Sequence, residues 1–189
     1  MTRLLTEICS KVEEFQHIRP EQVLVSATFA RSRRKAGLLA YVLPLKYRAG
    51  SPIERRVRGG REYHWAMLPY LREGREVLYI IYFVLPRFLH LSEREKLETV
   101  VHELYHISPD FNGDLRRFRG ARSVLHGTHK AFDAKVRQLT DAFLASAPPL
   151  NDYAFLSVSG RYADQLRATH IPEPRPKLLK VAACPPSPK

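Results

Sequence analysis

Apolar residues at the start of the chain recur at the spacing of an α-helix. Steps of three and four between them place the apolar side chains on one face, which predicts an amphipathic helix that ends before Pro20. These apolar positions are Leu4, Leu5, Ile8, Val12 and Phe15. The chain then changes to stretches rich in β-branched and aromatic residues, which are typical of strands.

Strands are expected in four apolar stretches. VLVSATFA at 23–30 and LLAYVLPL at 38–45 are separated by the basic turn RSRRKAG, and two more stretches follow at 63–68 and 76–85. The segment 47–61 carries glycines, a proline and many arginines, which indicates an exposed loop. EVLYIIYFVL at 76–85 is apolar on both faces, as expected for a central strand covered by helices. These stretches predict a small, mainly antiparallel sheet of three to four strands.

The start of a second helix is encoded by Ser92 and Glu95. They form the S-x-x-E pattern of a capping box, in which each side chain bonds the other's backbone N–H. This helix is expected to run to about Ile107 and to stop before Pro109, since proline cannot continue a helix. The turn-rich segment SPDFNGD follows, with Asn-Gly at its centre.

The last predicted helix begins near Gly127 or Thr128 and ends between Ser146 and Pro148. Its apolar residues repeat at steps of four, three and four, which indicates one buried stripe. The stripe consists of Phe132, Val136, Leu139 and Phe143.

The order of elements predicts an α+β fold with one small sheet and helices mainly on one side. The fold has an N-terminal helix, a central helix and a C-terminal helix. One domain is expected over residues 1–150, followed by an extension at 151–189 that becomes a proline-rich basic tail from about 170. The composition of this tail predicts a flexible segment, because it offers little apolar surface to bury.

Several classes of protein are excluded by composition. No apolar run approaches the roughly 18–20 residues of a membrane helix, so no membrane partner is expected. The N-terminus lacks the continuous apolar region of a secretory signal, which favours a cytoplasmic location. Cys9 and Cys184 are the two cysteines and neither belongs to a CxxC pair, so a cysteine-based zinc ribbon is excluded and a disulfide framework is not expected.

The net charge of +12 predicts attraction to polyanions. Arginine and lysine cluster at 30–35, 53–61 and 115–122. Charge alone produces electrostatic association with DNA or with acidic proteins, without sequence specificity. The alternative interpretation of these clusters is a solvated basic face with no partner.

The segment HELYH within the second predicted helix carries candidate chemistry. Residues four apart on a helix project from the same side, so His102 and His106 can bind one Zn²⁺. Glu103 projects beside such a metal, where its carboxylate can accept a proton from water. Glu95 and Thr99 lie on the histidine face one and two turns earlier, where they either orient a ligand or are solvated.

A catalytic zinc needs a third protein ligand in addition to the two histidines. LHGTHKAFD offers His126, just before the last helix, and His129, in its first turn. His126 is the favoured third ligand and His129 is the alternative. Asp110 and Asp114 are further candidates, although their place in DFNGD favours a role in the turn.

The chain resembles the SprT-like zinc metallopeptidases in the order of its motifs. These are HELYH, a gap of about twenty residues, and then HG before an aromatic residue in the last helix. The fuller strings HELYHISPDFNGDLRRF and LHGTHKAFD resemble the putative phage metallopeptidase family still more closely. The resemblance implies that His102, His106 and His126 bind zinc and that Glu103 is the catalytic glutamate. The gap from His126 to Phe132 is longer than usual in SprT-like proteins. For this reason His129 stays an alternative third ligand. Some SprT-like proteins act on DNA-bound proteins.

We therefore expect a zinc-dependent metallopeptidase that hydrolyses a protein or peptide substrate, with Glu103 as the base that activates water. The alternative is a basic module that binds nucleic acid or protein, in which any metal site is structural or vestigial. The basic clusters are compatible with both.

Overall fold

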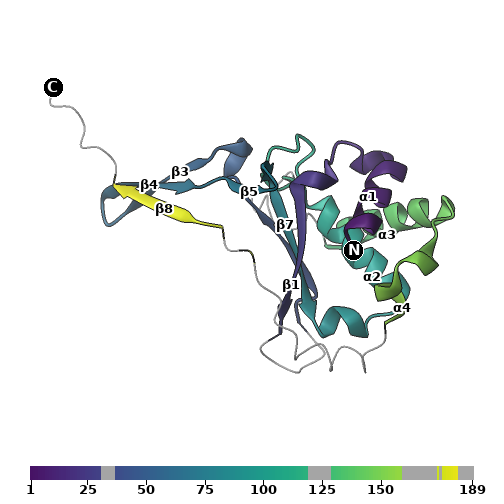
Figure 1. Ribbon diagram of the computed structural model, residues 1–189. Helices are drawn as coiled ribbons and strands as arrows, with labels where there is room; N and C mark the ends of the chain where they lie inside the picture. Colours follow the sequence, from purple (N-terminus) through teal and green to yellow (C-terminus); the bar gives the residue numbers. More distant parts are fainter. Residues whose placement is uncertain (31–36, 119–128, 159–173, 175, 183–189) are drawn as a thin grey trace.

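The computed structural model describes residues 1–30, 37–118, 129–158, 174 and 176–182. Figure 1 shows a central sheet with the helices gathered on one side and a second sheet projecting from the other. The helices are α1 (Thr2–Lys11), α2 (Glu93–Tyr105), α3 (His129–Ala145) and α4 (Ala154–Ser157). Short 3₁₀ turns occur at Glu13–Phe15, Pro20–Gln22, Arg48–Gly50, Arg87–His90 and Leu150–Asp152. The predicted α+β class is confirmed.

The central sheet contains three strands in the order β1-β7-β2. Strands β1 (Val23–Phe29) and β2 (Ala40–Pro44) flank β7 (Tyr79–Leu85) on either side. β1 runs parallel to β7 and β2 runs antiparallel to it. The two strands predicted at 23–30 and 38–45 therefore both pair with the central strand, and β2 is left as an edge of this sheet.

Strand β7 is buried along its whole length, as the sequence predicted for a central strand. Its odd-numbered residues, such as Tyr79 and Phe83, belong to the main core beneath the helices. Ile80 and Tyr82 point to the opposite face, where Tyr82 stacks on Tyr41 with 4.9 Å between ring centroids. This second face is covered by a smaller apolar cluster rather than by helices, in agreement with the prediction that the helices lie mainly on one side of the sheet.

Helix α2 begins at the predicted capping box. The side chain of Ser92 accepts from the backbone N–H of Glu95, and the Glu95 carboxylate accepts from the backbone N–H of Ser92 at 2.8 Å. Leu97, Val101 and Leu104 pack into the core. The apolar face of α2 therefore lies toward the sheet and leaves the histidine face toward α3.

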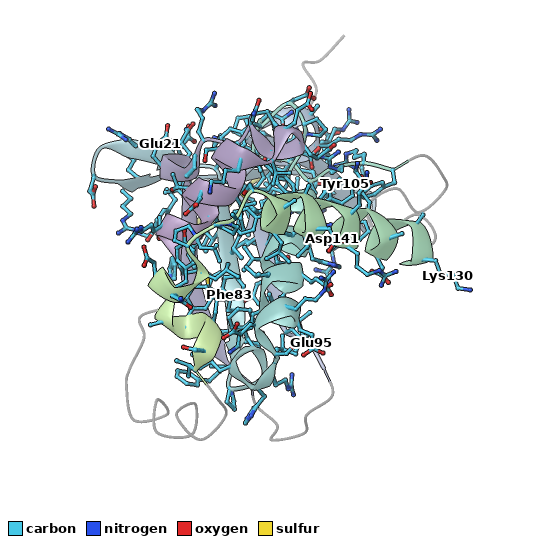
Figure 2. All side chains as sticks on the ribbon, turned by 90° about the vertical axis from the view of Figure 1, so that its right-hand side faces the viewer. Glu21, Phe83, Glu95, Tyr105, Lys130 and Asp141 are labelled. Carbon is cyan, nitrogen blue, oxygen red and sulfur yellow. The ribbon has the colours of Figure 1, made fainter. Side chains whose placement is uncertain are left out.

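Helix α3 buries the predicted stripe. Phe132, Val136, Leu139 and Phe143 are all at most 5% exposed. Figure 2, which views the helical side, shows α3 lying across α2 between Glu95 and Tyr105. The predicted start at residue 127 or 128 lies outside the described residues.

The second sheet contains three antiparallel strands in the order β3-β4-β8. β3 (Ile53–Arg58) and β4 (Arg61–Met67) form a hairpin, and β8 (Leu178–Ala182) pairs with β4. The predicted loop at 47–61 is thus wrong over β3. Gly59 and Gly60 have positive φ values of 59° and 71°, which allow a two-residue hairpin turn that twists with its strands.

The projecting sheet also changes the interpretation of the C-terminal part. β8 lies within the segment predicted to be a flexible tail, and the hydroxyl of Tyr82 donates to the backbone carbonyl of Pro174 at 2.6 Å. A third, two-stranded sheet joins β5 (Tyr70–Arg72) to β6 (Arg75–Val77). Among the described residues, no helix is long and apolar enough to span a membrane.

Candidate metal and catalytic site

His102 and His106 converge at the end of α2. Their Nε2 atoms lie 3.2 Å apart, and the ring planes meet at 71°. His106 is the C-cap of the helix but keeps helical dihedral angles of φ −73° and ψ −18°, so the four-residue spacing still aligns the two rings. Two nitrogens bound about 2.0–2.1 Å from one tetrahedral Zn²⁺ stand about 3.3–3.4 Å apart, which matches this separation.

The position of His106 is held by the chain that follows it. The backbone carbonyl of His106 accepts from the N–H of Arg116 at 2.7 Å, and Ile107 forms a β-bridge with Leu115. The carboxylate of Asp114 accepts from the backbone N–H of Ala49 and from the guanidinium of Arg117, each at 2.9 Å. The predicted turn role of Asp114 thus agrees with its contacts.

Asp110 and Asp114 line a cleft separate from the one that holds His102. Neither aspartate joins the histidine pair in a metal-binding group among the described residues.

Glu103 is 4% exposed, although it follows a ligand candidate on the helix surface. Burial raises the pKa of its carboxyl to about 8, because an ionised carboxylate loses hydration there. A hydrogen bond with the backbone of Val42, on edge strand β2, opposes this shift in pKa. The helix and the strand therefore hold the carboxylate between them.

A cleft of about 400 Å³ opens beside His102 and Glu103. One wall is formed by the chain entering β2, and the other walls are formed by α2 and α3. The cleft is lined by Gly37, Leu38, Leu39, Ala40, Leu91, Glu95, Glu98, Thr99, His102, Glu103, Asp133, Val136 and Arg137. The site thus combines convergent nitrogens, a buried carboxylate and a space open to a substrate.

The two residues expected to support the histidines from α2 have local partners. The Glu95 carboxylate belongs to the capping box, and the Thr99 hydroxyl donates to the backbone carbonyl of Glu95 at 2.7 Å. Both side chains still line the cleft. Their role toward a bound ligand stays a prediction.

Helix α3 brings Phe132 onto the histidine pair. The ring of Phe132 lies 4.7 Å from that of His102 and 4.9 Å from that of His106, measured between centroids. It also contacts Tyr105 at 5.1 Å. The first turn of α3, which begins at the alternative third ligand His129, is therefore adjacent to the histidine pair.

The third ligand itself is not among the described side chains. His126 lies outside the described residues, and His129 is described only as the first residue of α3. Within the described residues, no group of three metal-binding side chains is present. The donor chemistry of His102 and His106 and the spacing of their nitrogens fit a zinc ion.

The sequence did not predict a place in the site for three charged residues of the cleft, namely Glu98, Asp133 and Arg137. Asp133 and Arg137 lie four apart on α3, next to the buried stripe that begins at Phe132. Their spacing shows that they share a helix face. Only the packing of α3 against α2 shows that this face borders the site.

Residues 1–132 match the model of a family described as putative phage metallopeptidase. The chain belongs to this family. The phage metallopeptidase match ends at Phe132 and so includes the HELYH segment, His126 and His129. No curated protein and no solved structure matches the chain significantly. The predicted family is confirmed, whereas the relation to SprT-like proteins stays a prediction. The family description implies a metal-dependent hydrolase of peptides.

Proposed function

We propose that the protein is a zinc-dependent metallopeptidase. The observation that carries this proposal is the 3.2 Å approach of the Nε2 atoms of His102 and His106 beside the buried carboxyl of Glu103. His126 is the proposed third ligand and His129 is the alternative. A zinc ion with three protein ligands keeps one position open for water or substrate, which is the arrangement of a catalytic centre.

Glu103 is the proposed general base and acid. A bound Zn²⁺ supplies Lewis acidity, which lowers the pKa of water and polarises the scissile carbonyl. Glu103 accepts the proton as water attacks the peptide carbonyl, and it then donates that proton to the leaving amine. The hydrogen bond with the Val42 backbone restricts the carboxylate to one orientation for both transfers.

Peptides are favoured over other substrates by the strand that borders the cleft. β2 is an edge of the central sheet. A backbone group of Val42 already bonds Glu103, so pairing with an added strand is expected where the chain enters β2. An extended peptide that lies along Leu38, Leu39 and Ala40 can add to this edge by main-chain hydrogen bonds. Such pairing would present its carbonyl groups to the wall of α2 that carries His102 and Glu103.

The mechanism is tested by Glu103→Gln in the full chain loaded with one equivalent of zinc. Cleavage of unfolded β-casein, followed by mass spectrometry, should disappear in the variant because the amide cannot accept the proton. Zinc content should stay at one equivalent. Cleavage at the parental rate by Glu103→Gln would show that the mechanism is wrong.

The ligand set is tested by elemental analysis of three single variants. His102→Ala should lose zinc, and one of His126→Ala and His129→Ala should do the same. Loss of zinc in only one of the last two identifies the third ligand. Retention in both would contradict a three-histidine centre. Loss in both, without any cleavage by the parent, would favour a four-ligand structural site in a binding module.

A further inference from the structure

The projecting sheet β3-β4-β8 separates its side chains into two chemically different faces. Strand partners share a face, and successive residues alternate between faces. The register pairs Arg56 with Tyr63 and Trp65 with Lys180, so these four residues lie on one side. This side is called the basic aromatic face and consists of Arg56, Arg58, Arg61, Tyr63, Trp65 and Lys180.

Cations on the basic aromatic face are only partly neutralised. Arg56 pairs with Glu54 on the same face. Within the described part of the chain, no carboxylate lies in ion-pair distance of Arg58, Arg61 or Lys180, and all three are exposed. On the opposite face, by contrast, Arg55 forms an ion pair with Glu62 at 2.7 Å. The excess positive charge of this sheet is therefore concentrated on one side.

Two aromatic rings lie among these cations. The ammonium group of Lys180 lies 3.8 Å from the ring centroid of Tyr63 and 5.8 Å from that of Trp65. The guanidinium of Arg56 lies 5.9 Å from the Trp65 ring. Both rings are only partly buried, and Figure 1 shows that the helices lie away from this sheet. A ring surrounded by cations on an open sheet suits a ligand that carries both π-faces and negative charge.

We propose that the basic aromatic face binds single-stranded nucleic acid. Phosphates are expected to contact Arg58 and Arg61 near the hairpin turn. Unpaired bases displace the Lys180 ammonium from the Tyr63 ring and stack on Tyr63 and Trp65. This combination of a cationic surface with stacking rings is the usual design of single-strand binding surfaces. A duplex keeps its bases stacked inside, so its phosphates would contact the cationic side chains but its bases would not stack on Tyr63 and Trp65. An acidic protein would use the cations alone.

The first test uses Trp65, which is the only tryptophan in the chain. An oligothymidylate of about 16 nucleotides, within the usual site size of such surfaces, is titrated into the full-length protein. Stacking should quench the emission of Trp65 saturably, whereas a duplex of equal length and poly-L-glutamate should not. Absence of quenching, or equal quenching by poly-L-glutamate, would overturn the proposal.

The second test measures oligothymidylate binding by anisotropy across a series of salt concentrations. R58Q/R61Q removes two phosphate contacts and should reduce the slope of log affinity against log salt by about 1.4. Tyr63→Leu should weaken binding about fivefold or more through lost stacking. The matched control R72Q/R75Q removes the same charge from the β5-β6 hairpin. Its slope of log affinity against log salt should equal that of the parent.

An equal loss of affinity for oligothymidylate in R72Q/R75Q and R58Q/R61Q would show that binding depends on diffuse charge, which would contradict a defined binding face. Parental affinity in Tyr63→Leu, together with duplex binding as tight as single-strand binding, would also contradict it. The substituted arginines are exposed beside a glycine turn, so these variants are expected to keep the parental circular dichroism spectrum.

Discussion

Lys96 is a charged residue in the interior, 1% exposed. Its ammonium group donates to the backbone carbonyls of Leu156 at 2.7 Å and Val158 at 2.8 Å. Burial lowers the pKa of Lys96 because the charged form loses hydration. These two bonds connect α2, which carries the histidines, to the α4 segment, about 60 residues later in the chain.

Lys96→Met should lower the free energy of unfolding by about 1–3 kcal/mol, because both carbonyls lose a charged donor while the aliphatic stem is kept. The measurement is urea denaturation. Lys130→Met is the control, since Lys130 is exposed and projects from α3 in Figure 2; it should change stability by less than about 0.5 kcal/mol. Equal stability of Lys96→Met and the parent would show that these bonds contribute nothing net.

The lowered pKa of the Glu7 carboxyl makes the stability of the protein depend on pH. Hydrogen bonds from Lys11 and Tyr153, in that order of importance, lower the pKa of its carboxyl from 4.5. A depressed folded-state pKa adds stability above the unfolded pKa, and this stability is lost as pH falls through the folded value. Glu7→Gln should therefore destabilise the protein by about 0.5–1 kcal/mol at neutral pH. The deficit should shrink as pH falls below 4.5.

Thermal unfolding of the parent and Glu7→Gln across this pH range checks the prediction. Glu13→Gln is the control, because Glu13 is exposed and has no ion pair within the described residues. A deficit for Glu7→Gln that is constant with pH would mean that charge is not its cause.

Burial leaves a clear pattern in α2 and β7, so both elements were predicted. The predicted strand at 76–85 nevertheless divides into β6 and β7, which belong to different sheets. Ser92 and Glu95 mark the start of α2, and the uninterrupted apolar run of 79–85 marks a strand covered on both faces. Strand β3 was missed because both faces of its sheet meet solvent. Arginines then occupy positions that a half-buried strand would fill with apolar residues. The Gly59-Gly60 pair was the available hairpin signal.

Phe132 packs α3 on the rings of both His102 and His106. Phe132→Ala should let both rings reorient and should weaken zinc binding about 10-fold or more, which is typical when support for metal ligands is removed. Competition with a chromophoric chelator measures this affinity.

Phe88→Ala provides the control for Phe132→Ala. Phe88 is 1% exposed and packs on Phe83, away from the histidine pair. Both variants should lose about 3–5 kcal/mol of stability through the cavity they create. Only Phe132→Ala should change zinc affinity in the folded protein. An equal change in both would indicate a general effect of lost stability.

For the molecule as a whole, the sequence predicts the reactive groups of the site more fully than it predicts the residues that surround them. Within HELYH, the four-residue helical spacing aligns His102 and His106, and Glu103 projects beside them. The proposed third ligand, His126 or the alternative His129, stays a prediction, and residues 119–128 lie outside the described part of the chain. Asp133 and Arg137 line the cleft only because α3 crosses α2, and such a crossing is a property of packing.

Strand pairing divides the molecule into a central sheet and a projecting sheet, which are in contact where Met67 of β4 packs against the apolar cluster that contains Ile80 and Tyr82. β8 pairs with β4, whereas β7 pairs with β1 and β2. Deleting residues 178–189 should therefore speed amide hydrogen exchange in 63–67, where strand pairing is lost, and leave exchange in 79–85 unchanged. Zinc content should also stay unchanged. Deleting only 183–189 is the control and should alter neither segment. Faster exchange in 79–85 after the longer deletion would show that β8 supports the core that carries the site.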